Sequence, residues 1–378
     1  MSSVEEELRY GFGKNWAEFV EKSFNEEVVD QSRAGLCNLL RADSLRGKVF
    51  LDIGCGSGVH SLAAHRLGAA RIVSFDYDRD SVATTAELRR RAGEPANWEV
   101  RQGSVLDPAF MKALPPADIV YSWGVLHHTG DMWTAVRNAA VPLKPDGVFY
   151  IALYSSDIYL DPSPEYWIKV KRRYNRAGPR GRRLMEWWYV GRFLVLPALK
   201  SGQNPLSVIR NYGHRGMTFW TDAKDWLGGY PIEFAGLAET QEFCKRELDL
   251  DLVNLKTGEG CTEYVFCRLA ENAEWRRTAQ QRQLKLLPGP YVAQGGARYA
   301  ASVPVLADEA DGPAAPARSR LMLYEDGQLL GLAHTRHDQI SNYGKGRFSH
   351  WGADVHFSAT DNSDPNSNGR HYSYCERF

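Results

Sequence analysis

The run FLDIGCGSG, residues 50–58, places alternate glycines directly after a short apolar segment and directly before a helix-forming one. Glycine has no Cβ, so it permits a tight turn and lets the backbone approach a ligand closely. A strand that enters such a turn and then a helix is typical of open α/β sheets, which bind ligands at the carboxyl ends of their strands. The run therefore predicts a doubly wound α/β fold with a ligand site at the turn. The glycines are Gly54, Gly56 and Gly58.

Further residues indicate which kind of ligand the turn would bind. A dinucleotide-binding turn requires a small residue where this chain has Val59, and it expects no acid where the chain has Asp52. One strand and helix further on, Asp76 ends the apolar run RIVSFD, where a carboxylate can accept hydrogen bonds from both hydroxyls of a ribose. Ser104 and Val105 follow the third apolar run, where an adenine ring would lie. Together these positions favour a nucleoside-containing ligand other than a dinucleotide.

The rest of the chain supports this fold class and adds further segments. From 49 to 155, short β-rich runs alternate with helical patterns, which predicts a parallel, doubly wound sheet, and residues 17–45 predict one or two helices ahead of it. Residues 156–230 break the rhythm and predict a helical insertion after the fifth strand. The runs at 250–257 and 262–269 then predict an antiparallel hairpin that completes a seven-stranded sheet.

The composition changes again after residue 270. We expect a first domain over residues 1–270, a linker and packing segment over 271–317, and a small all-β module over 318–378. Within that module, DPNSNG at 364–369 resembles the opening of a calcium loop, but Cys375 stands where the loop's final glutamate belongs, so an ordinary turn is favoured and no metal is predicted.

Charge and cysteine usage exclude several classes of function. The chain has 46 lysines and arginines against 46 aspartates and glutamates, so it lacks the overall positive charge of a general nucleic-acid or anionic-membrane binder. Its six cysteines form no CxxC pair, which disfavours a zinc cluster and a disulfide framework. The acidic start lacks a secretory leader, and no run of about 18 apolar residues occurs. We therefore expect a cytoplasmic protein without a membrane partner; the oligomeric state stays unknown.

Taken together, these motifs resemble those of the class I S-adenosylmethionine (SAM)-dependent methyltransferases, over residues 10–269. The similarity is closest to a bacterial subgroup with the segments FGKNW, LDIGCGSG, SFDYD, YSWGVLHHTGDMW and DWLGGYP, although Thr262 stands where related chains often have asparagine. The resemblance implies a Rossmann-like fold and SAM as cofactor, with S-adenosylhomocysteine (SAH) as product. It implies cofactor contacts from Trp16, Asp52, Gly54, Gly56, Gly58, Asp76, Tyr77, Ser104, Val105, Trp123 and Gly124.

His127 and His128 are the candidate catalytic residues. They follow the fourth strand, at the edge of the sheet where ligands bind, and an imidazole titrates near neutrality. Either could take a proton from a hydroxyl or an amine, although one of the pair would more simply orient the loop. Methyltransferases that modify the tRNA wobble uridine have a similar GVLxH segment in which both positions line the pocket.

Candidate substrate residues come mainly from the insertion. Residues 155–220 hold 12 basic residues, 4 acids and 11 aromatics, a composition that suits an anionic or sugar-like substrate, or RNA, but also suits a solvated helix face. The predicted substrate contacts are Tyr154, Trp167, Arg215 and Trp226.

The motifs therefore predict a methyltransferase that moves a methyl group to a hydroxyl, or an amine, of a small-molecule or sugar-like acceptor, such as a natural product or polysaccharide precursor. A tRNA wobble-uridine-type methyltransferase is the first alternative, opposed by the zero net charge and the lack of a recognisable RNA-binding module. A non-catalytic SAM-binding scaffold with a carbohydrate-binding tail is the second.

Overall fold

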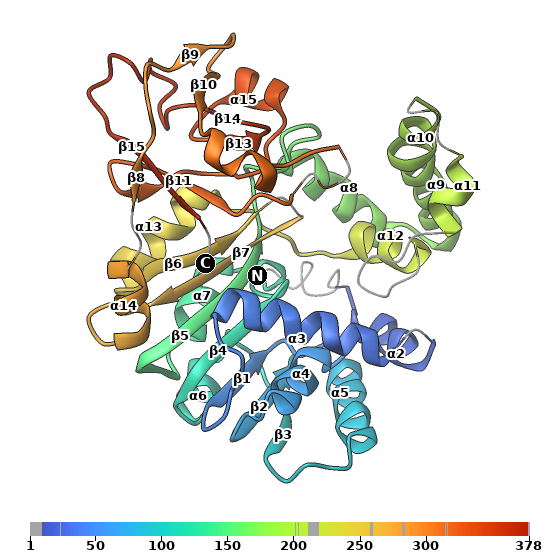
Figure 1. Ribbon diagram of the computed structural model, residues 1–378. Coiled ribbons are helices and arrows are strands. Elements are labelled where there is room, and N and C mark those ends of the chain that lie inside the picture. The colour runs from blue at the N-terminus through green and yellow to red at the C-terminus, as the bar shows by residue number, and fades with distance from the viewer. Residues whose placement is uncertain are drawn as a thin grey trace.

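A seven-stranded, mostly parallel sheet forms the centre of the protein in the computed structural model (Figure 1). The structure describes residues 10–22, 24–200, 202, 204–210, 219–257, 260–281, 284–313, 315 and 317–376. The strand order is β3-β2-β1-β4-β5-β7-β6, and β7 alone runs antiparallel to its neighbours in this sheet. This order confirms the predicted Rossmann-like fold. The strands are β1 (Val49–Ile53), β2 (Arg71–Asp76), β3 (Trp98–Gln102), β4 (Ala117–Trp123), β5 (Leu143–Tyr154), β6 (Asp251–Lys256) and β7 (Cys261–Cys267).

Helices cover both faces of the sheet, which is why its strands are apolar on both sides. Side chains of α3 and α4 pack with Phe50 and Tyr121 on one face, and side chains of α6, α7 and α13 pack with Leu51 and Phe149 on the other. The first face is covered by α2 (Gly13–Lys22), α3 (Glu26–Leu40), α4 (Val59–Arg66) and α5 (Arg79–Arg91); the second by α6 (Pro108–Lys112), α7 (Met132–Ala139) and α13 (Leu237–Leu248).

Aspartates start the helices that follow β2, β3 and β4. The side chains of Asp78, Asp107 and Asp131 accept hydrogen bonds from the first free backbone N–H groups of α5, α6 and α7. Such caps satisfy donors that have no partner inside the helix. Because each cap follows the carboxyl end of a strand, the three helix starts meet at one edge of the sheet.

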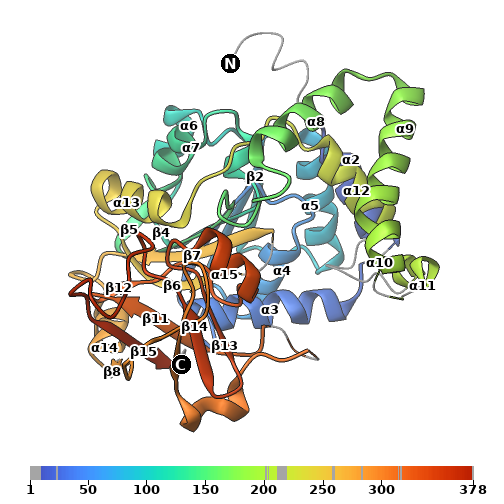
Figure 2. The ribbon, with the colours of Figure 1, turned by 90° about the horizontal axis from the view of Figure 1, so that it is seen from above.

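The predicted insertion is helical and projects from the sheet, as Figures 1 and 2 show. Residues 178–210, called the arm below, include α9, the π-helical turn, α10 and α11. Residues 211–218 lie outside the described part of the chain. The helices are α8 (Pro164–Arg176), α9 (Pro179–Val190), the π-helical turn Gly191–Val195, α10 (Leu196–Lys200), α11 (Pro205–Arg210) and α12 (Phe219–Gly228).

The C-terminal part forms two four-stranded antiparallel sheets, ordered β13-β14-β10-β9 and β12-β11-β15-β8. Three of their strands come from residues 285–302, inside the segment predicted to be a linker, so the predicted boundary at 318 cuts across both sheets. A helix, α15, is inserted between β12 and β13. The elements are α14 (Ala273–Gln281), β8 (Lys285–Leu286), β9 (Val292–Ala293), β10 (Tyr299–Ser302), β11 (Leu321–Glu325), β12 (Gln328–Leu329), α15 (His337–Tyr343), β13 (Phe348–Trp351), β14 (Asp354–Phe357) and β15 (Tyr372–Glu376).

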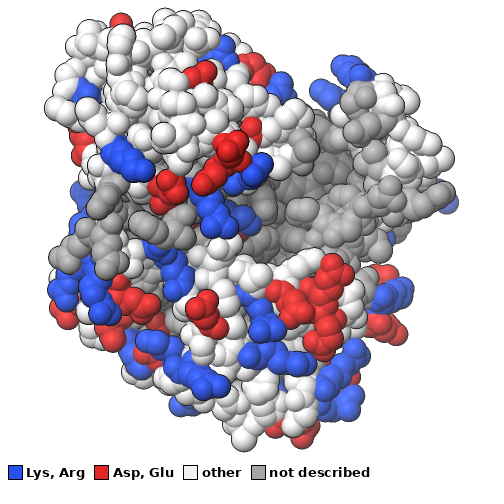
Figure 3. Space-filling view, viewed as in Figure 1, with Lys and Arg blue, Asp and Glu red and all other residues white. Residues whose placement is uncertain are grey.

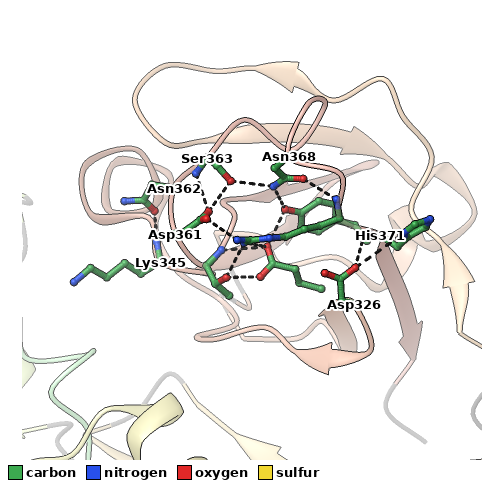
Figure 4. A network of polar contacts seen from close by, with 11 residues as sticks. Asp326, Lys345, Asp361, Asn362, Ser363, Asn368 and His371 are labelled. Carbon is green, nitrogen blue, oxygen red and sulfur yellow. Dashed lines mark hydrogen bonds and ion pairs between the residues drawn. The ribbon is translucent and has the colours of Figure 1, made fainter.

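A polar network holds the long loop between β14 and β15 (Figure 4). Arg370 donates to Glu325 of β11 at 3.1 Å and to Asp361 at 2.5 Å, and the hydroxyl of Tyr372 donates to Glu325 at 2.8 Å. Within DPNSNG, Asp364 accepts a bond from the backbone N–H of Asn366 at 2.9 Å, as in an ordinary turn. The polar groups of this loop therefore serve to fix its own conformation.

Arg347 joins the C-terminal sheets to the first domain. It is buried, and its Nη2 donates to the carbonyl of Asp157, just beyond β5, at 2.7 Å, while Nη1 donates to the carbonyl of Gly344 at 2.9 Å. Charged hydrogen bonds in buried positions stabilise more than exposed ones.

We expect Arg347→Met to lower the free energy of unfolding by about 2 kcal/mol, because it leaves the Asp157 carbonyl without its donor and removes one of the two donors to the Gly344 carbonyl. The matched control is Arg336→Met, which removes an exposed pair with Asp338 and should change stability by less than about 0.5 kcal/mol. Urea unfolding of the full chain followed by fluorescence measures both. Equal effects of the two substitutions would contradict the assigned role of Arg347.

Candidate active site

The main cavity lies at the carboxyl edge of the sheet and has a volume of about 1530 Å³. Its wall includes the turn after β1, the ends of β2, β3 and β4, residues of α2 and α3, part of α12, and the β6–β7 hairpin. Single-ligand pockets usually measure about 300–1,000 Å³. The cavity therefore has room for two ligands side by side. Figure 3 shows a notch in the surface between the arm and the C-terminal part of the chain.

The glycine turn requires glycine at each predicted position. Gly54, Gly56 and Gly58 have φ values of +74°, +52° and +81°, which favour glycine. A Cβ on Gly54 would lie 2.4 Å from Val125, and one on Gly56 would lie 3.0 Å from the indole Nε1 of Trp16. Gly54, Gly56 and Trp16, three of the predicted cofactor contacts, line the cavity, whereas Gly58 caps α4 and packs against Thr85 outside the lining.

Asp76 connects the glycine turn to the turn after β2. Its Oδ2 accepts from Gly56 N at 3.0 Å, and its Oδ1 accepts from Asp78 N at 2.9 Å. Burial raises the pKa of this carboxyl to about 6, against the lowering effect of these two backbone bonds. Asp76 and the exposed Tyr77 line the cavity, so the structure brings both predicted residues to the glycine turn.

The remaining predicted cofactor residues line the adjoining wall. Ser104 and the buried Val105 lie beyond β3, and the Ser104 hydroxyl accepts from Leu106 N at 3.2 Å. Trp123 ends β4, and Gly124 follows it with a φ of +73°. These four residues and Asp76 thus line the same cavity.

Asp52 lies beneath the turn and does not line the cavity. Its side chain is buried and accepts from the Ser61 hydroxyl at 2.5 Å, and Ser61 is in turn 2.6 Å from the Ser74 hydroxyl, which accepts from Trp98 Nε1 at 2.8 Å. Burial raises the pKa of Asp52 to about 7, although the Ser61 bond lowers it. The observed contacts of Asp52 are therefore those of a residue that supports the turn from below.

The two candidate catalytic histidines point to different environments. His127 is fully buried behind the cavity wall, its Nδ1 accepts from Tyr154 N at 3.3 Å, and burial holds its pKa well below the usual range. His128 lines the cavity, and its Nδ1 lies 2.7 Å from the carbonyl of Pro231. Because a carbonyl only accepts, this nitrogen of His128 carries a proton, and in the neutral ring the lone pair is on Nε2. The structure thus brings only His128 to the cavity.

Aromatic side chains form the wall above His128. Tyr154 and Trp226, two of the predicted substrate contacts, line the cavity together with Tyr159, whose ring stacks on Trp226 with the centroids 5.2 Å apart. Trp167 is buried behind Trp226, with ring centroids 5.0 Å apart, and does not line the cavity. The predicted contact from Arg215 lies outside the described residues.

A polar group at the β5–β7 end of the cavity was not predicted. Glu263 of β7 is buried, accepts from the Tyr150 hydroxyl, and pairs with Lys256 Nζ at 3.1 Å. On the same side, His60 of α4 packs against Tyr121, with ring centroids 5.0 Å apart, and burial lowers the pKa of His60 to about 4. All five residues line the cavity. The one available signal was a charged residue, Glu263, inside the apolar run TEYVFC.

Residues 44–185 match the family model described as a methyltransferase domain. This part of the chain is a methyltransferase domain. The match covers the first five strands and the start of the insertion, which includes most of the wall around the glycine turn.

Individual relatives are similar to parts of the chain. A ubiquinone biosynthesis O-methyltransferase from Methylobacterium sp. (strain 4-46) is 30% identical over 117 residues, which are 30% of this chain and 43% of that protein. A ribosomal protein L11 methyltransferase from Stenotrophomonas maltophilia (strain K279a) is 45% identical over 56 residues, 15% of this chain and 18% of that protein. The chain thus spans less than half the length of both relatives. The crystal structure of magnesium protoporphyrin IX methyltransferase from Synechocystis PCC 6803 with bound SAH aligns over 71% of this chain and 88% of that protein's chain. The sequence identity is 12% and the TM-score is 0.38.

SAM is the cofactor of this methyltransferase domain, and the residues of the glycine turn fit it. A Cβ on Gly56 would crowd the indole of Trp16, so glycine keeps the backbone of the turn accessible there. Asp76 supplies a carboxylate for the ribose hydroxyls, and Val105 supplies an apolar surface for the adenine. In the described part of the chain, no group of three or more His, Cys, Asp or Glu side chains could hold a metal ion. Over the same residues, no helix is both long enough and apolar enough to cross a membrane.

We expect Asp76→Asn to weaken SAM binding by about 100-fold, because it removes the charge from hydrogen bonds to the ribose. Asp52→Asn is the matched control: it lies outside the cavity lining, and its amide oxygen can still accept from Ser61, so it should weaken binding much less. Isothermal titration with SAM measures both. If Asp52→Asn weakened binding as much as Asp76→Asn does, the supporting role given to Asp52 would be wrong.

SAM affinity should also depend on pH through Asp76. The carboxyl titrates at about pH 6 in the protein without ligand, so it is ionised and accepts from the ribose above that pH. As the pH falls through about 6, protonation removes an acceptor and affinity should decrease. Titrations on both sides of this pH should show the decrease in the wild type and not in Asp76→Asn. A pH-independent affinity in the wild type would contradict this assignment.

Proposed function

We propose that the protein transfers a methyl group from SAM to a hydroxyl of a small-molecule or sugar-like acceptor. The supporting observation is that one cavity connects the glycine turn and Asp76 with a second space lined by His128, aromatic rings and the Lys256–Glu263 pair. We call this second space the acceptor chamber. It is lined by His128, Tyr154, Tyr159, Trp226, Lys256 and Glu263.

His128 is the candidate base. SAM supplies an electrophilic methyl group when bound. The bond from His128 Nδ1 to the Pro231 carbonyl fixes the orientation of the ring and places the lone pair of the neutral imidazole on Nε2, which we assign as the proton acceptor. As the acceptor's oxygen gains the methyl group, its proton passes to Nε2. An amine acceptor would use the same arrangement.

The acceptor chamber suits a polyhydroxylated molecule. The rings of Tyr154 and Trp226 are perpendicular, at an interplanar angle of 82°, and present apolar surfaces of the kind that pack against the faces of sugar rings. Glu263 accepts from Tyr150 and Lys256, and its two carboxylate oxygens have further lone pairs that can accept bonds from the hydroxyls of an acceptor. Polar groups at fixed positions in a mostly aromatic cavity are typical of small-molecule sites.

The two alternatives receive less support. Among the relatives described above are enzymes named as methyltransferases, which does not favour a non-catalytic scaffold. A tRNA acceptor is opposed by the balanced net charge, since RNA-binding proteins usually present an excess of basic residues. A cytoplasmic location remains part of this proposal.

The test begins with a labelled-methyl screen of hydroxylated small molecules, nucleotide sugars, amines and bulk tRNA. With the accepted substrate, His128→Gln should lower turnover by about 100-fold or more while SAM affinity stays unchanged, because the proton acceptor is lost. His127→Gln serves as the comparison. It should lower the free energy of unfolding, while the protein that remains folded keeps most of its turnover. Normal turnover in His128→Gln would refute the base assignment, and transfer to tRNA alone would refute the acceptor class.

A further inference from the structure

The arm exposes an unusual number of large apolar side chains. Leu184 and Trp187 of α9 are 72% and 54% exposed, and Leu199 of α10 and Leu206 of α11 are 59% and 68% exposed. Trp188 and Leu196 are exposed beside them. Single exposed apolar residues are ordinary, but a group of them on one projecting element indicates a surface that binds a partner. Figures 1 and 2 both show the arm standing away from the sheet.

On the described surface of the arm, every exposed charged side chain is a lysine or an arginine. Arg180, Arg183, Arg192 and Lys200 are exposed. Glu186 is the one acid between residues 178 and 210, and it is buried, where it accepts from the Tyr174 hydroxyl at 2.8 Å. The described atoms of the arm in Figure 3 show lysine or arginine and no acid. The balanced charge of the whole chain therefore conceals a local excess of positive charge.

We propose that the arm binds the surface of an anionic phospholipid bilayer. Helices that lie on membranes combine tryptophan and leucine with lysine and arginine, and the basic residues pair with acidic headgroups while the apolar ones enter the boundary of the acyl chains. Attachment of this kind needs no spanning helix, and the described residues contain none. The sequence predicts no membrane partner, because the charges of the whole chain balance and no apolar run is long enough to span a bilayer. Neither observation concerns a local surface such as the arm.

A second copy of the chain fits the arm less well. A two-fold interface brings the same surface of both copies together. Two arms meeting in this way would place their exposed arginines and lysines against each other, with no exposed carboxylate on the described arm to compensate them. Acidic headgroups supply that compensation.

The arm also reaches the cavity. Tyr189, which follows Trp187 and Trp188 in α9, lines the cavity wall. Binding through the arm would hold the acceptor chamber beside the bilayer, where amphiphilic acceptors gather. This consequence rests on the proposed function, whereas the binding of lipid does not.

Flotation of the purified full chain with vesicles tests the proposal. The vesicles contain phosphatidylcholine with phosphatidylglycerol, or phosphatidylcholine alone, at low and high salt. We expect flotation with the anionic vesicles at low salt. The charge variant Arg180→Gln, Arg192→Gln, Lys200→Gln should lower the partition coefficient by about 100-fold, since each basic residue near an anionic surface contributes about 1 kcal/mol. The apolar variant Leu184→Gln, Trp187→Gln, Leu199→Gln should abolish flotation.

Leu286→Gln with Val305→Gln is the matched control, because both residues are exposed and apolar but lie outside the arm; flotation should be unchanged. Titration with SAM confirms that each variant is folded, so lost flotation cannot be attributed to unfolding. The proposal is overturned if the wild type does not float, or if the arm variants float as the control does. It is also overturned if the wild type is a dimer that does not float and the apolar variant is a monomer. That result would identify a second copy of the chain as the partner of the arm.

Discussion

The bond from Gly56 N to the Asp76 carboxylate determines where the rest of the site can lie. It ties the turn after β1 to the end of β2, and the second oxygen of Asp76 ties the same point to the start of α5 through Asp78. The carboxylate is partly desolvated, which raises its pKa to about 6, so bonds that favour its charged form matter to both structure and binding. From Asp76 the cavity extends toward β4, β5 and β7. In the proposed reaction the cofactor would lie at the end near Asp76, and the acceptor at the end near β5 and β7.

The same physical constraint, burial, separates residues that look equivalent in the sequence. His127 and His128 are adjacent, yet one is sealed behind the cavity wall and the other lies in it. Asp52 is the penultimate residue of β1 and Asp76 the last residue of β2, but Asp52 is bonded to Ser61 beneath the turn and Asp76 lines the cavity. In each pair, the residue with access to the cavity is the one suited to chemistry, and its partner supports the backbone that positions it.

The features predictable from the sequence were those encoded locally. The glycine turn follows β1 directly and Asp76 is the last residue of β2, so their place at the sheet edge follows from the strand pattern alone. The Lys256–Glu263–Tyr150 group was not predictable, because it forms only when β5, β6 and β7 pair. Strands β8 and β9 have two residues each, too few for an alternating pattern to be recognised, so their segment was interpreted as a linker. Trp167 lies in a helix whose buried side could not be placed before its packing against Trp226 was known.

The central claim is that the cofactor site and the acceptor chamber are adjoining parts of one cavity and that His128 lies where they meet. A crystal structure of the protein with SAH tests this most directly. The account predicts the ribose hydroxyls on Asp76, the adenine against Val105, and the thioether sulfur facing the space between His128 and Tyr154. SAH bound with its sulfur turned away from His128, or bound elsewhere than at the glycine turn, would contradict the account.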